Sequence, residues 1–152
     1  MTDPERTQLA SHPVLLYDGV CVLCNEVVRF LLRHDTQNTF RFVPLESPLA
    51  TELLAPFGPQ PTQEGVALIT SALSPVERLY HRSNAVAQAL QLLPKPWPRL
   101  GRALALIPRP LRELGYTLVA RLRYRLFGRY ETCPLPTPRE RDQILSIDPH
   151  KK

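Results

Sequence analysis

The chain has 152 residues, of which 43% are hydrophobic and 22% charged, and its formal net charge is +5. These values are typical of one globular domain with an ordinary core, and they exclude a fibrous repeat or a wholly disordered chain. Three cysteines argue against a small secreted disulfide scaffold, and no uncharged apolar run reaches the roughly 18 residues that a transmembrane helix needs. Residues 1–12 lack the apolar stretch of a secretory signal, so we predict a disordered N-terminal tail and a cytoplasmic protein.

The first predicted elements lie in the segment VLLYDGVCVLCNEVVRFLLRH. Its short apolar run, residues 14–17, predicts a buried strand that ends at the turn-forming pair Asp18-Gly19. From residue 22 to residue 33, apolar side chains recur with helical spacing while arginines occupy the other side, which predicts an amphipathic helix. Cys21 and Cys24 are therefore expected where a strand passes into a helix.

The following elements predict an α/β fold. In chain order they are a strand (39–43), a helix (48–57), two strands (66–70 and 76–81) and a helix (84–93). Ser47 and Ser83 are the expected N-caps of the two helices. The short connection 71–75 favours an antiparallel hairpin. The order β-α-β-α-β-β-α on one four-stranded mixed sheet is the thioredoxin-like arrangement, in which a C-x-x-C pair follows the first strand.

A basic helical extension follows. Between residues 93 and 130, nine basic residues and one acidic residue give a local charge of +8. Prolines 108 and 110 separate two expected helices, about 97–107 and 111–127. In the second helix a leucine seam is interpreted as core packing, with the arginines pointing elsewhere and available to an acidic partner. The domain is expected to span residues 13–138, including the helices at about 97–128, and residues 139–152 are predicted to form a flexible tail.

The two cysteines have the spacing of a redox pair. A thiolate, rather than a thiol, attacks a disulfide, and the unpaired amides of a helix N-terminus favour a thiolate at Cys21. We therefore predict Cys21 as the nucleophile and Cys24 as the more buried, resolving thiol that closes a redox-active disulfide. Asp18 has two open roles: its carboxylate either caps the turn or exchanges a proton with Cys24 through water.

Two other interpretations remain open. Zinc needs four ligands, which Cys21, Cys24, Cys133 and one histidine (His12, His34 or His81) would supply. Alternatively, the same fold is a non-catalytic binding module that uses its basic C-terminal helix as the contact surface. Nucleic acid is not an expected partner, because no nucleic-acid-binding motif accompanies the arginines.

The sequence resembles the DCC-type thiol-disulfide oxidoreductase family, named for its Asp-x-x-Cys-x-x-Cys motif, over about residues 14–138. The matching strings are YDGVCVLCNEVVRFLLRHD, FRFVPLES, YHRSNAVAQAL, IPRPLRELGYTLVARLRYRLFG and ETCPLP. Residues that match family motifs are Asp18, Cys21, Cys24, Ser83, Ala85, Arg123, Tyr124, Arg125, Phe127, Gly128 and Cys133.

The resemblance implies a thioredoxin-like fold and an enzyme that exchanges its dithiol with a protein or a low-molecular-weight thiol or disulfide. No metal or organic cofactor is expected, and Asp18, Cys21 and Cys24 are the expected site residues. In one respect the sequence departs from better-studied thioredoxin-like enzymes, which place a cis-proline directly before the third strand. Here Pro61 stands several residues before Val66.

Overall fold

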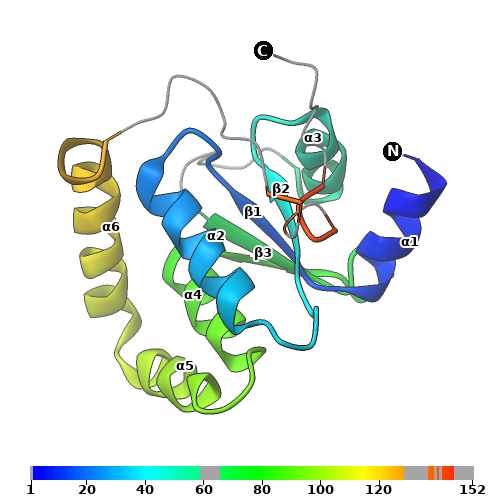
Figure 1. Ribbon diagram of the computed structural model, residues 1–152. Coiled ribbons are helices and arrows are strands. Elements are labelled where there is room, and N and C mark those ends of the chain that lie inside the picture. The colour runs from blue at the N-terminus through cyan, green and yellow to red at the C-terminus, as the bar shows by residue number, and fades with distance from the viewer. Residues whose placement is uncertain (1, 59–65, 129–136, 139, 141, 146–152) are drawn as a thin grey trace.

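The computed structural model in Figure 1 describes residues 2–58, 66–128, 137–138, 140 and 142–145. Its strands are β1 (Val14–Tyr17), β2 (Arg41–Pro44), β3 (Val66–Thr70) and β4 (Arg78–His81). Its helices are α1 (Asp3–Ser11), α2 (Val22–His34), α3 (Pro48–Leu54), α4 (Arg82–Gln91), α5 (Trp97–Leu106) and α6 (Arg109–Leu126), with a 3₁₀ turn at Ala55–Phe57. The predicted α/β class with one four-stranded mixed sheet is confirmed, and the arrangement is consistent with a thioredoxin-like fold.

The sheet has the order β2-β1-β3-β4. β1 pairs with β2 in parallel and with β3 antiparallel, and β3 and β4 form the predicted antiparallel hairpin. Parallel neighbours cannot be joined by a tight turn, so the chain crosses over through α2. This crossover fixes the N-terminus of α2 at the carboxyl end of β1.

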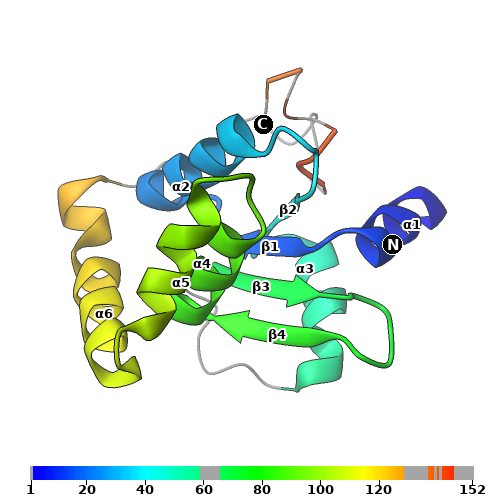
Figure 2. The same ribbon diagram turned by 90° about the horizontal axis from the view of Figure 1, so that it is seen from below.

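Both faces of the sheet are covered (Figure 2). Alternate residues of a strand point to opposite faces, so Leu15 and Tyr17 pack with α2 and α4, while Val14 and Leu16 pack with α1 and α3. All four residues of β1 are buried, which explains why this strand reads as a continuous apolar run.

The N-terminal segment differs from its prediction. Residues 3–11 form α1 instead of a disordered tail, and a capping box between Thr2 and Glu5 satisfies amides at the start of the helix. Leu9 is completely buried, and Gln8 accepts a hydrogen bond of 2.9 Å from Nε of the buried Arg41 on β2. One apolar anchor and one polar contact thus attach a helix whose composition is otherwise polar.

Replacing Leu9 by alanine tests whether α1 belongs to the folded domain. Removing a fully buried leucine side chain leaves a cavity, so Leu9→Ala is expected to lower the free energy of unfolding by about 2–4 kcal/mol. The measurement is urea denaturation followed by circular dichroism. Leu106→Ala is the matched control, because Leu106 is 84% exposed and its loss is expected to cost less than about 0.5 kcal/mol. Equal stabilities of the Leu9 variant and the wild type would contradict the packing of α1.

The C-terminal segment also differs from its prediction. The amide of Leu145 donates to the carbonyl of Phe42, and the amide of Phe42 donates to the carbonyl of Gln143, each at 2.8 Å. The Gln143 side chain donates to Asp35 at 2.8 Å. Residues 143–145 therefore extend the sheet beyond β2 and cover its edge, instead of belonging to a flexible tail.

The two helices of the extension lie where the prolines predicted them, but the leucine seam is not core. Leu111, Leu114, Leu118 and Leu126 are between 58% and 70% exposed. The opposite side of α6, which includes the buried Arg123, faces the domain. Within the described part of the chain, no helix is long and apolar enough to cross a membrane.

Candidate active site

Cys21 and Cys24 lie at the predicted junction between β1 and α2. Cys21 is the N-cap residue of α2, and its sulfur accepts the backbone N–H of Cys24 at 3.3 Å. The first amides of a helix have no partner within the helix, and with the helix dipole they favour negative charge at this position. Both cysteines are free thiols in the structure, so it represents the reduced pair.

Both cysteine side chains are buried, but Cys24 is not the more buried of the two, contrary to the prediction. Cys21 has no exposed surface, whereas Cys24 is 5% exposed, so Cys24 is not the more buried sulfur. The reason is local. The N-cap position turns the Cys21 sulfur back toward the amide of Cys24, while the Cys24 side chain extends from the first turn of α2 to Arg123 of α6.

Two side chains hold the turn between β1 and α2. The amide group of buried Asn25 donates to the carbonyls of Gly19 and Cys21 at 2.8 and 2.9 Å. Asp18 accepts the N–H of Val20 at 3.1 Å through Oδ1. Asp18 therefore stabilises the turn, as one of its two predicted roles requires, while the helix itself is capped by Cys21.

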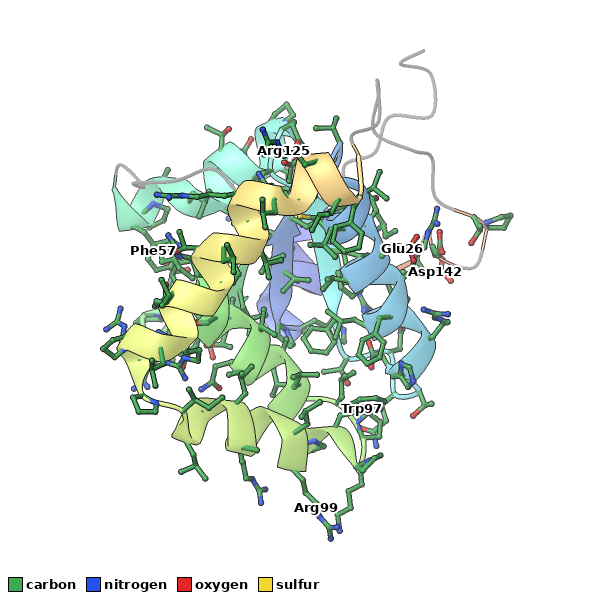
Figure 3. All side chains as sticks on the ribbon, turned by 90° about the vertical axis from the view of Figure 1, so that its left-hand side faces the viewer. Glu26, Phe57, Trp97, Arg99, Arg125 and Asp142 are labelled. Carbon is green, nitrogen blue, oxygen red and sulfur yellow. The ribbon has the colours of Figure 1, made fainter. Side chains whose placement is uncertain are left out.

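Arg123 connects this turn to α6. Its side chain is 3% exposed, with Nη2 at 3.3 Å from Oδ2 of Asp18 and Nη1 at 3.6 Å from the sulfur of Cys24. The structure thus brings Asp18, Cys21 and Cys24 together, as predicted, and adds a buried guanidinium from a residue 99 positions after Cys24. Figure 3 looks at α6 from outside the domain.

The surroundings hold the Cys24 thiol in its protonated form. Burial, followed by the hydrogen bond to Cys21 and the negative charge of a Cys21 thiolate, raises the pKa of Cys24 from its ordinary 9.0 to about 12. Arg123 acts in the opposite direction but does not outweigh these effects. When the pair carries one negative charge, the remaining proton therefore stays on Cys24.

A second carboxyl group, which the sequence did not single out, joins the turn. Both carboxyl oxygens of Glu46 accept the N–H of Gly19, at 3.1 and 3.2 Å. Burial, together with a hydrogen bond to Asp18, raises the pKa of Glu46. Glu46, Asp18 and Arg123 therefore form a connected polar group that ends at the Cys24 sulfur.

Polar contacts dock the rest of α6. Ser83 donates to Glu113, whose other oxygen lies 2.9 Å from Nε of Arg82. The hydroxyl of Tyr116 accepts the N–H of Val66 at 3.2 Å, at the start of β3. The prediction that Ser83 caps α4 is therefore wrong: His81 is the N-cap residue, and Ser83 lies within the helix and holds α6.

The part of the chain that the structure describes offers no set of ligands for the zinc alternative. Among these residues, no cluster of three or more histidine, cysteine, aspartate or glutamate residues could hold a metal ion. His34 stands at the other end of α2, about 15 Å along the helix axis from Cys24 at 1.5 Å per residue. Cys133 and Pro61 lie outside the described residues.

Comparison with known proteins agrees with this geometry. Residues 15–129 match the model of the DCC1-like thiol-disulfide oxidoreductase family. The chain belongs to this family. The matched span of the DCC1-like chain includes Asp18, Cys21, Cys24 and Arg123 and ends before Cys133.

Two curated relatives support the assignment. A chloroplastic DCC family protein of Arabidopsis thaliana is 36% identical over 124 residues, which are 81% of the DCC1-like chain and 69% of the relative. The uncharacterised protein YuxK of Bacillus subtilis is 32% identical over 133 residues, which are 87% of the DCC1-like chain and 93% of the relative. No solved structure matches the chain significantly.

Proposed function

We propose that this DCC1-like chain is a thiol-disulfide oxidoreductase whose Cys21-Cys24 dithiol exchanges with a disulfide in a protein or in a small molecule. The observation that carries the proposal is the environment of the pair. Cys21 caps a helix N-terminus and accepts the amide of Cys24, while the Cys24 sulfur lies beside a buried guanidinium. The helix amides favour negative charge at Cys21 and burial keeps the proton on Cys24, which suits the starting state for exchange.

The reaction begins with attack of the Cys21 thiolate on one sulfur of the substrate disulfide. The substrate S–S bond breaks, a mixed disulfide forms at Cys21, and the leaving thiolate takes up a proton. Cys24 then loses its proton and attacks the Cys21 sulfur, which releases the second substrate thiolate and leaves an intramolecular disulfide. The protein dithiol loses two electrons and the substrate disulfide gains them, so this chemistry requires neither a metal nor an organic cofactor.

Arg123 and Asp18 act as positioning residues in this scheme. The guanidinium stabilises negative charge on Cys24 when that thiol ionises, and Asp18 holds the guanidinium in place. Direct proton exchange between Asp18 and Cys24 is less well supported, because both Asp18 oxygens already have partners in Val20 and Arg123. Because Cys21 has no exposed surface, its attack also requires a local shift of neighbouring side chains.

Mass spectrometry tests the exchange. All proteins carry Cys133→Ser, so that only the two site thiols remain. Incubation with oxidised glutathione is expected to remove two hydrogen atoms from the reference protein and to leave a stable glutathione adduct on Cys24→Ser at Cys21. Cys21→Ser is the matched control and should form no intramolecular disulfide. A purified protein that holds stoichiometric zinc and resists oxidation would contradict the proposal and favour the zinc alternative.

A cytoplasmic location remains a prediction. The small, odd number of cysteines is typical of a protein in a reducing compartment, but one relative carries the word chloroplastic in its name. Fractionation of cells that express the tagged chain checks the location directly.

One observation favours a second role, as a binding module. The segment from α5 to the residue after α6 exposes nine large apolar side chains: Leu100, Leu106, Ile107, Leu111, Leu114, Leu118, Val119, Leu126 and Phe127. Three of them, Ile107, Leu111 and Val119, line a cavity between α6 and the domain. Exposed arginines accompany them, among them Arg99 on α5 and Arg125 on α6 (Figure 3). Exposed apolar side chains accompanied by arginines fit a protein partner that offers an apolar patch and carboxylates.

Charge reversal tests this surface. Arg125→Glu is expected to weaken partner capture at low salt, whereas Arg33→Glu on the remote end of α2 is the control and should not. Binding to anionic vesicles instead of protein would assign the surface to a membrane.

A further inference from the structure

A cavity of about 470 Å³ lies between α2, α4, α5 and α6, directly beside the candidate active site. Cys24 and Arg123 line one part of its wall. Most of the remaining lining is apolar and includes Leu23, Val27, Val86 and Leu104. Cys24 therefore borders a space whose walls are mostly apolar.

Several polar side chains in the cavity wall form hydrogen bonds with neighbouring elements. Ser83 donates to Glu113, Arg112 donates to Asn84, and the hydroxyl of Tyr116 accepts the amide of Val66. The guanidinium groups of Arg112 and Arg123 also reach this wall and contact Asn84 and Asp18, but most of the wall is apolar. A charged ligand would therefore lose its hydration over most of its surface, which costs several kcal/mol as an order of magnitude. An uncharged, apolar group has no charge to desolvate and buries its surface favourably against the same walls.

We propose that this cavity is a substrate subsite that takes the uncharged, apolar substituent of a low-molecular-weight disulfide. The proposal rests on the exchange function and specifies its substrate class. The volume is roughly three times the ~150 Å³ that suffices for a benzene ring, so an aromatic or branched aliphatic group fits with room to spare. A small molecule is favoured over a protein cystine because Cys21 is completely buried and Cys24 nearly so.

A substituent bound in the subsite would hold the substrate disulfide next to the two cysteines during the exchange. With the substituent R of an R–S–S–R substrate in the cavity, attack by the Cys21 thiolate breaks the S–S bond and releases one R–S⁻, which is protonated by solvent. The retained R group keeps the mixed disulfide next to Cys24, because Cys24 lines the same cavity. Cys24 then gives up its proton and displaces the second R–S⁻. One substrate disulfide becomes two thiols, and the protein dithiol becomes a disulfide.

Cavity filling tests the subsite. Ala120 lines the cavity from α6, and a phenylalanine there occupies the space that R requires. Leu118→Phe adds a ring to the same helix on its exposed face and is the matched control. Val86→Phe fills the cavity from α4 and replaces the first variant if Ala120→Phe does not fold. All variants carry Cys133→Ser and are compared by thermal unfolding before use.

The substrates are 2,2′-dithiodipyridine, which is uncharged and aromatic, and oxidised glutathione, which is charged. Rates of disulfide formation are divided by the rate of each substrate with free cysteine, which removes intrinsic reactivity. Wild type is expected to favour the aromatic substrate by about tenfold or more, in the range that apolar pockets achieve. Ala120→Phe is expected to abolish this preference by lowering the rate with the aromatic substrate, while Leu118→Phe changes neither rate.

The outcomes separate the two proposals. If neither substrate closes the Cys21-Cys24 disulfide in the wild type, the exchange function is wrong. If both substrates close it but the cavity variants leave the preference unchanged, the subsite is wrong and the exchange function stands. A cystine peptide with flanking phenylalanines is a third substrate. If only that peptide responds to Ala120→Phe, the cavity serves a protein substrate and the small-molecule assignment is overturned.

Discussion

Arg123→Met is expected to lower the free energy of unfolding of the reduced protein by about 3–5 kcal/mol, although methionine has a similar length and packs well in apolar surroundings. The loss of stability arises because the buried carboxylate of Asp18 remains without its cationic partner. Asp18 is 6% exposed and keeps a buried carboxylate whose contact at 3.3 Å with the guanidinium has been removed. Urea denaturation of the reduced variant and of the wild type gives the difference.

The control is Arg121→Met, which removes an arginine of the same helix that is exposed. Its loss is expected to change the free energy of unfolding by less than about 0.5 kcal/mol, because surface charges contribute little. A similar result for the two variants would show that the basic charge of α6, and not the specific contact with Asp18, accounts for the effect.

The double variant Asp18→Asn/Arg123→Met separates the stranded charge from lost packing. Asparagine keeps an oxygen that accepts the N–H of Val20, so the turn retains its hydrogen bond. Without the buried carboxylate, the double variant is expected to recover a large part of the stability lost in Arg123→Met. No recovery would assign the loss to packing around residue 123.

The sequence was sufficient to predict the sheet and the position of the cysteines because these features depend on local patterns. The apolar run of β1, the turn at Asp18 and the helical spacing after Cys21 lie within one short segment. The hairpin of β3 and β4 likewise follows from two strands with a short connection. In each case neighbouring residues contain the information that forms the element.

The side of α6 that docks could not be predicted in this way. Leucine spacing identifies a helix, but it does not show whether the leucine side faces the domain. Here the docking side is chosen by contacts with distant residues, such as Tyr116 with Val66 and Glu113 with Ser83. For the same reason, no local pattern distinguished Arg123 from the other arginines of its helix, and only the family resemblance drew attention to it.

The N-terminal helix was missed for a different reason, because its local helix signals are present but its buried apolar positions are too few. Its local signals, a capping box and Pro4 in the first turn, are present in the sequence. A single buried residue, Leu9, attaches it to the core, so the helix has no repeating apolar pattern from which its packing could be predicted. Short amphipathic patterns with one anchor are missed by any argument that counts apolar positions.

The ionisation of Cys24 is the second prediction with a large effect. In the reduced Cys133→Ser protein, thiolate absorbance near 240 nm is expected to show at most one ionised thiol up to about pH 10, with Cys24 ionising as the pH approaches about 12. The difference from an ordinary thiol is about a thousandfold in the ionisation equilibrium, since each pKa unit is a factor of ten. Tyrosine ionisation is subtracted with the oxidised protein, which contains the same tyrosines and no site thiols.

The same shift determines how stability depends on pH. The folded protein retains the Cys24 proton more strongly than the unfolded chain, so the unfolded chain loses it first as the pH rises. The resulting stabilisation is complete below about pH 9 and is lost as the pH rises toward about 12. Cys21→Ala removes two of the causes, the hydrogen bond and the charge of Cys21, but leaves burial in place. The pKa of Cys24 in that variant is therefore expected to fall and to remain above its ordinary value, whereas an unchanged pKa would show that the two thiols do not interact.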